Sequence, residues 1–224
     1  MLTRCISGAV LVVIALVTMF IGGPLLAATL LVVSLVAFRE LTKALKCNKE
    51  GKGFNALEIV GLAGVVIYYV TVYFGNDTTR LMGIVFVFMA AMFFYVFRFP
   101  KYDASQVVAT VFSFLYAPVM LSFIYLTRSI EHGAYIVWLI LISSWVCDTF
   151  AYFVGVTIGK KRIFPILSPK KSLEGCIGGV IGSAIVGALY AYLFMTKAMD
   201  GPYVIPMVAF TGMEKIRGEM GMLV

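Results

Sequence analysis

Long apolar blocks separated by short polar links make up most of this chain. The blocks are about twenty residues long, which is the length that an α-helix needs to cross about 30 Å of hydrocarbon. Alternating segments of about ten residues, the pattern of a membrane β-barrel, are not seen. The pattern predicts an all-α, polytopic helical membrane protein with about eight transmembrane helices in a single domain over residues 1–212. The expected helices are 5–21, 25–38, 56–74, 81–97, 106–126, 134–158, 175–194 and 203–212.

The first block resembles a secretory signal peptide, because Arg4 precedes the apolar run 5–21. A signal peptide is followed by polar mature sequence. Here a second apolar stretch follows Gly22-Gly23-Pro24 at once. We therefore expect an uncleaved helical hairpin with its turn at these three residues.

Composition and charge agree with a membrane protein. Of the 224 residues 62% are hydrophobic and 13% are charged, whereas a soluble domain carries about a quarter charged residues. The net charge of +7 comes from cations in the links, so we expect anionic lipid headgroups and no nucleic acid as partners. The four cysteines lie singly and predict neither disulfides nor a zinc site.

The positive charges also predict the orientation. With the N-terminus in the cytoplasm, fifteen of the 18 Lys and Arg residues fall in inside segments. Because cytoplasmic links carry the excess of cations, both termini are expected to be cytoplasmic. The link from Arg39 to Asn55 is then a solvated cytoplasmic loop.

An acid stands inside the sixth block. Asp148 lies about nine residues before the end of the block, on the order of 13 Å deep, and a carboxylate there should face a bundle interior or a wet cavity. The alternative is a structural Asp that is hydrogen-bonded to a neighbouring helix, for example through Thr149 or Ser143. The helical face that contains Asp148 runs through Ser144, Asp148, Tyr152, Gly155 and Gly159.

The segment that begins at Ser168, after this block, resembles the start of a helix. Ser168 is a suitable N-cap and Pro169 suits the first helical position. Lys170 and Lys171 would then lie in the first turn, where the helix dipole disfavours cations. A bound phosphate would resolve that conflict; the alternative is a positive anchor at the cytoplasmic side.

Two glycine patterns have simpler interpretations. Gly155-x-x-x-Gly159-Lys160 is one residue short of a Walker A loop and lacks its Ser or Thr, so a nucleotide loop of that kind is rejected. The seventh block carries a face of small residues that predicts close helix packing. These residues are Gly175, Gly178, Gly179, Gly182, Ser183 and Gly187.

Together these segments resemble the phosphatidate cytidylyltransferase family, membrane enzymes that make CDP-diacylglycerol. The similarity is carried by D-T-x-A-Y-x-x-G-x-x-x-G-K at 148–160 and S-P-K-K-S-x-E-G at 168–175. R-x-x-S-G at 4–8 and F-R-E-L at 38–41 add weaker support. The resemblance covers residues 1–195 or so.

The resemblance implies a nucleotidyl transfer in which a phosphatidate oxygen attacks the α-phosphorus of CTP and diphosphate leaves, with Mg²⁺ as cofactor. It implies an integral protein of a bacterial inner or plasma membrane, with phosphatidate, CTP and the bilayer as partners and a homodimer as one possible assembly. Asp148, Lys170 and Lys171 would be catalytic, with Asp148 also a metal ligand, and Glu174 would orient a lysine. The remaining substrate-binding candidates are Ser144, Thr149, Tyr152, Gly155, Gly159, Lys160, Ser168, Pro169, Ser172, Glu174 and Gly175.

One part of the family pattern is missing. The C-terminal block of that family, with its Lys-Arg pair, Pro-Gly-His-Gly-Gly and Asp-Arg-x-Asp, does not occur here. We therefore expect a truncated or frame-shifted chain with little or no activity. We also expect an atypical, disordered tail at 213–224 that is unrelated to the family.

Three other functions stay open at this point. A CTP-dependent lipid kinase would share the setting but would transfer the γ-phosphoryl group. A small ion-coupled transporter also carries an intramembrane acid and glycine-broken helices, but an internal repeat is not found. A non-catalytic protein that binds phosphatidate or CTP is the third.

Overall fold

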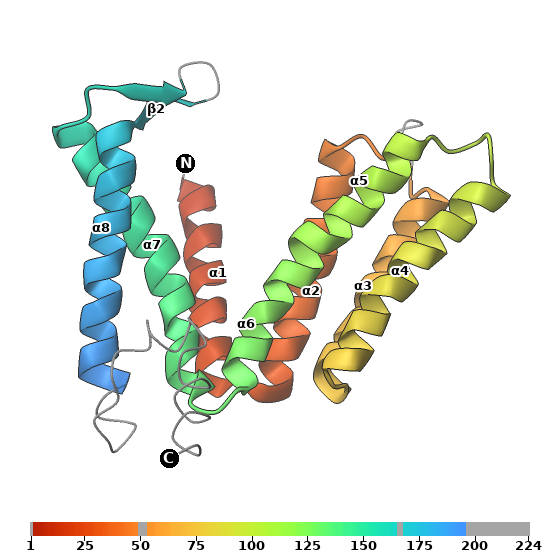
Figure 1. Ribbon diagram of the computed structural model, residues 1–224, viewed down its shortest axis with the longest axis horizontal. Coiled ribbons are helices and arrows are strands. Elements are labelled where there is room, and N and C mark those ends of the chain that lie inside the picture. The colour runs from red at the N-terminus through yellow and green to blue at the C-terminus, as the bar shows by residue number, and fades with distance from the viewer. Residues whose placement is uncertain (1, 49–52, 165–167, 196–224) are drawn as a thin grey trace, which may run out of the picture. The chain divides into compact units, whose positions relative to one another are not determined.

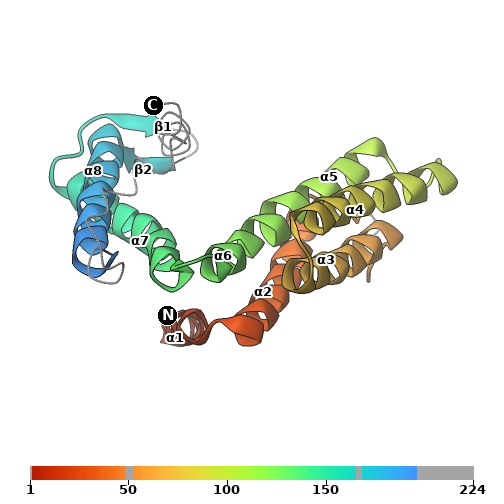
Figure 2. The same ribbon diagram turned by 60° about the horizontal axis from the view of Figure 1, so that its bottom comes forward.

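The computed structural model describes residues 2–48, 53–164 and 168–195 (Figures 1 and 2). The expected helix at 203–212 and the tail at 213–224 lie outside these residues. The described residues up to Ala134 form one compact unit, and those from Tyr135 onward form a second. The sequence analysis expected a single transmembrane domain.

Unit 1 is a bundle of helices. Helix α3 packs between α2 and α4, α5 contacts all three, and α6 lies against α2 (Figure 1). This architecture confirms the predicted all-α class. The elements are α1 (Leu2–Ile21), α2 (Gly23–Ala44), α3 (Ala56–Phe74), α4 (Asp77–Phe97), α5 (Ala104–Phe114), the π-helical turn η1 (Leu115–Val119) and α6 (Met120–Ser129).

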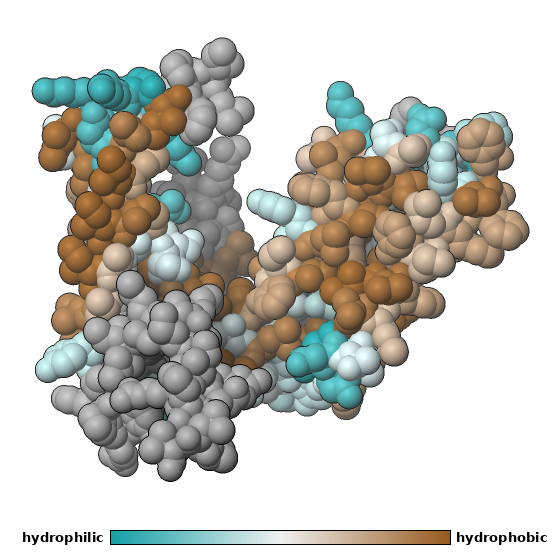
Figure 3. All heavy atoms as spheres, viewed as in Figure 1, coloured by the Kyte–Doolittle hydropathy of each residue, from teal (hydrophilic) through white to brown (hydrophobic). Residues whose placement is uncertain are grey.

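The described residues contain six helices that are long and apolar enough to cross a membrane, and α1 adds a shorter apolar stretch, Leu11–Ile21. Figure 3 shows hydrophobic side chains along the flanks of the helices and hydrophilic ones toward their ends. The chain is therefore an integral membrane protein, while the predicted count of eight spans stays a prediction.

Buried hydroxyl groups in the core of unit 1 pair with one another. The hydroxyls of Ser34 and Tyr69 lie 2.7 Å apart, and those of Tyr68 and Ser122 lie 3.0 Å apart, all four side chains being buried. Internal pairing is required where no water is available to hydrogen-bond these groups. These contacts tie α2, α3 and α6 together.

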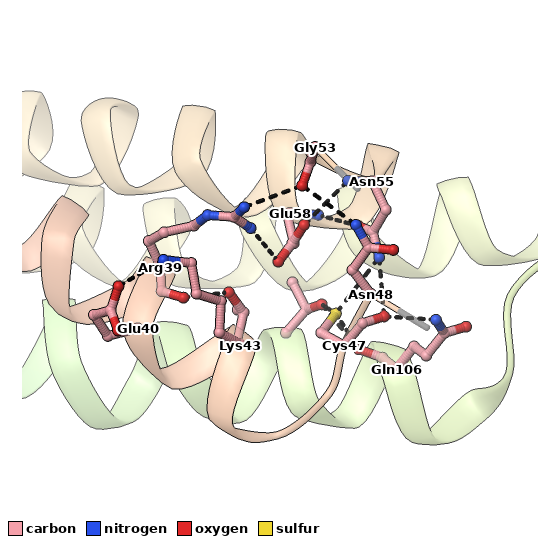
Figure 4. Close-up of polar contacts among 11 residues, drawn as sticks. Arg39, Glu40, Lys43, Cys47, Asn48, Gly53, Asn55, Glu58 and Gln106 are labelled. Atoms are coloured by element: carbon pink, nitrogen blue, oxygen red, sulfur yellow. Dashed lines mark hydrogen bonds and ion pairs between the residues drawn. The ribbon is translucent and has the colours of Figure 1, made fainter. Parts of the chain in front are cut away.

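Helix α2 continues past the predicted end at residue 38 to Ala44. The extra turn contains Arg39, whose guanidinium lies 2.6 Å from the carboxylate of fully buried Glu58 on α3. It also donates to the carbonyl of Gly53 at 3.0 Å (Figure 4). The same guanidinium lies 4.0 Å above the centre of the Phe54 ring. The expectation of a solvated loop from Arg39 onward is therefore wrong at Arg39, because a buried partner draws the arginine into the bundle.

Loops on the same predicted side of the membrane lie at the same end of unit 1. The guanidinium of Arg128, in the last turn of α6, donates to the carbonyl of Met19 at 3.1 Å, beside the α1–α2 turn. That turn is made by Gly22 and Gly23, both with positive φ, which glycine adopts without steric cost. At the opposite end, the α2–α3 and α4–α5 connections line one pocket.

Unit 2 is a helical pair with a β-hairpin at one end. Helix α7 (Gly133–Thr157) leads into strands β1 (Arg162–Phe164) and β2 (Ser168–Ser172), and α8 (Leu173–Tyr190) follows, ending in the π-helical turn η2 (Ala191–Met195). The strands are antiparallel, with Arg162 opposite Ser172 and Phe164 opposite Ser168. The sequence analysis did not predict this hairpin.

Candidate active site

Helices α7 and α8 pack closely because α8 presents glycine where the helices meet. A Cβ added at Gly178 would lie 2.6 Å from the Val154 side chain, and one at Gly179 would lie 2.8 Å from the carbonyl oxygen of Cys147. A Cβ at Gly182 would overlap the ring of Phe150. The small residues of α8 therefore allow close helix packing, as their spacing indicates.

The predicted Asp148 face of α7 divides into two parts. Its last two positions pack against the start of α8, since a Cβ on Gly155 would lie 3.2 Å from the Ser172 hydroxyl and one on Gly159 would overlap it. A Cβ at Gly175 would in turn lie 3.1 Å from the Cα of Gly155. These glycines let the end of α7 and the start of α8 approach each other.

The other part of this face is exposed in the described structure. The side chains of Ser144, Asp148 and Thr149 are exposed, and Tyr152 is 67% exposed. None of them lies on the glycine-packed side of α7. The glycines at its end position the hairpin, while Asp148 lies nine residues before the helix end at Thr157, or about 13 Å along the axis.

In the sequence analysis, the alternative to a functional Asp148 was a structural one, hydrogen-bonded for example through the hydroxyl of Thr149 or Ser143. In the structure the Thr149 hydroxyl donates to the carbonyl of Trp145 at 2.7 Å, and the Ser143 hydroxyl donates to that of Ile140 at 3.0 Å. Both hydroxyls are therefore engaged by the backbone of α7 itself. Neither holds the carboxylate of Asp148.

The start of α8 differs from the prediction. Ser172 is the N-cap, and its hydroxyl accepts a hydrogen bond from the backbone N–H of Gly175 at 3.2 Å. Ser168 and Pro169 belong to β2, so the predicted helix start at Ser168 is wrong. A two-stranded ribbon consists of edge strands, where a proline without an N–H is tolerated.

This later start removes the electrostatic conflict in the prediction. Lys170 and Lys171 precede α8 instead of standing in its first turn. The acid in the first turn is Glu174, at the helix end that favours negative charge. The argument for phosphate binding from misplaced lysines therefore no longer holds, and support for it has to come from the hairpin.

Glu174 connects the start of α8 to the link that follows α7. Its carboxylate accepts from the backbone N–H groups of Lys160 at 3.1 Å and Lys161 at 3.2 Å. The backbone N–H of Leu173 also donates to the carbonyl of Lys161 at 2.8 Å. Glu174 therefore positions the main chain of this link, whereas the sequence analysis expected it to orient a lysine side chain.

The hairpin and this link present cations to solvent. The side chains of Lys160, Lys161, Arg162 and Lys171 are all exposed. Lys161 and Arg162 were not among the predicted site residues, although the Lys-Lys-Arg run directly after Gly159 is a usable signal. The predicted residues thus form two groups, one at the hairpin and one, with Asp148, deeper along α7.

The described residues contain no group of three or more His, Cys, Asp or Glu side chains that could hold a metal ion. Asp148 is the acid that α7 contributes. Magnesium is often held by one or two carboxylates together with substrate phosphates. One carboxylate does not make a magnesium site by itself, so a metal here would depend on the phosphates of a bound substrate.

Comparison with known proteins gives a consistent result. The model of a family described as the cytidylyltransferase family matches residues 2–224. This match extends past the motifs to the end of the chain. It does not agree with the expectation that residues 213–224 are unrelated to the family.

Three individual relatives are all named phosphatidate cytidylyltransferase. A phosphatidate cytidylyltransferase of Thermotoga maritima is 47% identical over 92 residues, which are 39% of this chain and 34% of the relative. One from Aquifex aeolicus is 25% identical over 206 residues, 92% of this chain and 72% of the relative. One from Staphylococcus aureus is 26% identical over 194 residues, 86% and 72% of the two chains.

Proposed function

Because this chain belongs to the cytidylyltransferase family, we propose that it is a phosphatidate cytidylyltransferase of a bacterial plasma membrane. The reaction joins CTP and phosphatidate. A phosphate oxygen of phosphatidate forms a bond to the α-phosphorus of CTP, the bond between that phosphorus and the β-phosphate oxygen breaks, and diphosphate leaves. The products are CDP-diacylglycerol and diphosphate.

One structural observation supports the proposal most directly. Four exposed cationic side chains lie on a hairpin and link that are anchored to the start of α8, at the end of a span that carries an acid. Fixed cations stabilise the negative charge that develops on transferring phosphoryl groups. The spans themselves supply the surroundings that the diacyl tails of phosphatidate require.

The proposed role of each residue follows from its position. Lys160, Lys161 and Lys171 hold phosphate oxygens of CTP at the membrane surface. Glu174 and Ser172 keep the hairpin in place through the hydrogen bonds described above. Asp148 is the candidate for a Mg²⁺ ion that arrives with the phosphates, and such an ion would neutralise charge on the leaving diphosphate.

The test is equilibrium binding of CTP to the purified full chain in detergent, with CDP-diacylglycerol formation measured in parallel. Binding and turnover are measured separately so that a loss of CTP affinity can be distinguished from a loss of catalysis. Lys160→Gln/Lys171→Gln should weaken CTP binding about tenfold or more, since each lost phosphate contact removes a charge-assisted hydrogen bond.

The matched control is Lys43→Gln/Lys46→Gln, which removes the same charge from the α2–α3 region of unit 1. It should bind CTP like the unaltered chain. Equal loss in both variants, or no binding of CTP or phosphatidate at all, would overturn the proposal. Release of CDP with a phosphorylated lipid, in place of diphosphate, would identify a lipid kinase instead.

A further inference from the structure

A polar pocket of about 400 Å³ lies at one end of unit 1, where the α2–α3 and α4–α5 connections meet. Its volume is within the range of small-ligand pockets, about 300–1,000 Å³. The pocket belongs entirely to unit 1. It is therefore formed by other residues than the hairpin of unit 2.

The floor of this pocket is connected by hydrogen bonds. Gln106 is 7% exposed, and its amide donates to the carbonyl of Cys47, while its side-chain oxygen accepts from the backbone N–H of Asp103 at 2.9 Å. The Asn55 amide donates to the same Cys47 carbonyl at 3.0 Å (Figure 4). These hydrogen bonds connect the start of α5 to the α2–α3 connection beneath the pocket.

Tyr102 supplies a hydroxyl at this floor. Its side chain is 5% exposed, and its oxygen accepts a hydrogen bond from the backbone N–H of Ala56 at 3.3 Å. A phenol can accept and donate at the same time. The hydroxyl proton of Tyr102 can therefore be donated to an oxygen of a bound ligand.

The charge of the described lining favours an anion. Arg98 and Lys101 line the pocket, and Asp103 is the acid beside them. The Lys101 ammonium lies 6.0 Å from the centre of the Tyr102 ring, above the same floor. Two cations and a hydroxyl are the donors that a phosphate group takes.

The pocket lies among the ends of three candidate membrane spans, where lipid headgroups are expected. The spanning helices α3 and α5 begin at Ala56 and Ala104, and α4 ends at Phe97, so the lining residues stand where three spans leave the hydrocarbon. On the α3 side the lining includes Phe54 and Ile59, each 55% exposed. A ligand with a phosphate and an apolar tail matches this combination better than a nucleotide does.

We propose that this pocket binds the phosphate headgroup of an anionic phospholipid, with an acyl chain along the exposed apolar side chains of α3. Arg98 and Lys101 bind the phosphate oxygens and Tyr102 donates to one of them. The described lining residues of this site all belong to unit 1 and are different from those proposed for the reaction in unit 2. It holds a lipid in the headgroup layer beside the bundle.

The experiment is native mass spectrometry of the full chain in detergent, titrated with phosphatidylglycerol, phosphatidate or phosphatidylcholine. Arg98→Gln/Lys101→Gln should weaken binding of the two anionic lipids about tenfold or more, because each cation near the surface adds to the attraction for anionic lipid. Phosphatidylcholine adducts should not change. The control Lys43→Gln/Lys46→Gln removes the same charge from the same end of unit 1, outside the pocket lining.

The outcomes separate the possible sources of the phosphate. If both double variants bind the anionic lipids equally weakly, the lipids are attracted by the general surface charge. That result would contradict a specific site in this pocket. Glycerol 3-phosphate that binds as tightly as the lipids, with the same dependence on Arg98 and Lys101, would show a site for free phosphate compounds and not for lipid. CTP binding, measured in the same variants, should stay unchanged, so failure here is distinguishable from failure of the proposed reaction.

Discussion

At the scale of single residues, Ser172 determines where α8 begins. Its hydroxyl accepts a hydrogen bond from the backbone N–H of Gly175, and the residue is only 3% exposed. The same side chain contacts the glycines at the end of α7. One serine thereby caps a helix and sets the approach of its neighbour. Ser168, four residues earlier, lies in a strand and caps nothing.

Replacing the two serines in turn tests this assignment. Ser172→Ala should lower the free energy of unfolding by about 1 kcal/mol, the usual cost of a lost N-cap. Ser168→Ala should have a clearly smaller effect. Thermal unfolding in detergent measures both, and a larger loss with Ser168→Ala would restore the helix start predicted from the sequence.

Cys47 is a second residue whose surroundings have a measurable consequence. Burial raises the pKa of its thiol above the ordinary 9.0, outweighing hydrogen bonds with Thr110 and Asn55 that lower it. Since the native state then holds the thiol proton more tightly than the unfolded state does, stability is unaffected below pH 9 and falls as pH rises above it.

The matched variant is Cys47→Ser, whose hydroxyl does not ionise in this range. Between pH 8 and 10 the unfolding temperature of the unaltered chain should fall more steeply than that of Cys47→Ser. If the unfolding temperatures of the two proteins fall in parallel with pH, ionisation of the Cys47 thiol does not contribute to the pH dependence of stability.

At the scale of elements, the α7–α8 pair depends on the absence of side chains. Glycine occupies the positions on α8 that meet Cys147, Phe150 and Val154, and no larger residue fits there without movement. Overpacked sites cost about 1–3 kcal/mol. Close contact therefore requires both the glycines of α8 and the larger residues of α7 that pack against them.

Gly182→Ala should lower the unfolding temperature of unit 2 because its Cβ would meet the Phe150 ring. Gly187→Ala is the control, since its Cβ would lie 4.0 Å from the nearest atom, on Leu139. We expect a loss of about 1–3 kcal/mol for the first and no loss for the second. Equal effects would mean that helix propensity and not packing decides.

A charge pair adds to the contact between α2 and α3. Glu58 is fully buried and Arg39 is 21% exposed, with 2.6 Å between them. Glu58→Gln keeps the capping-box geometry at Asn55 but leaves the arginine without its counter-charge. Because breaking a buried pair is costly, we expect a loss of about 3 kcal/mol, read as a lowered unfolding temperature in detergent.

Glu40→Gln provides the comparison, because Glu40 pairs with Lys43 on the exposed side of α2. It should leave the unfolding temperature almost unchanged, as surface pairs contribute little. If both variants behave alike, the buried pair is not what holds α2 against α3.

At the scale of the whole molecule, the distribution of charge predicts how the chain crosses the membrane. The α2–α3 and α4–α5 connections share one end of unit 1, and the Arg128 region shares the other end with the α1–α2 turn. This arrangement agrees with the alternation that the Lys and Arg count requires.

Single cysteines in a background without the native ones test the orientation. In intact cells a membrane-impermeant maleimide should label Glu131→Cys but not Lys46→Cys or Lys161→Cys. The latter two should react only after the membrane is permeabilised. Labelling of position 161 from outside would place the proposed CTP site on the wrong side for its substrate.

The sequence by itself determined the membrane class, the location of six of the expected spans, the family resemblance and the stretch from Asp148 to Gly175 as the candidate site. These follow from local properties, namely apolar length, cation distribution and motif spacing. For the same reason the range 56–74 could be read directly, since α3 runs from Ala56 to Phe74.

The tertiary structure alone decided where α8 begins, what Glu174 binds and what Arg39 contacts. The sequence analysis chose Ser168 as the N-cap, whereas in the structure Ser172 caps α8. That difference depends on strand pairing with residues 162–164 and on the hydrogen bonds that Glu174 accepts from the backbone N–H groups of Lys160 and Lys161. Likewise, Arg39 could not be assigned from its neighbours, because Glu58 is nineteen residues away in the chain and becomes its partner only when α2 packs on α3.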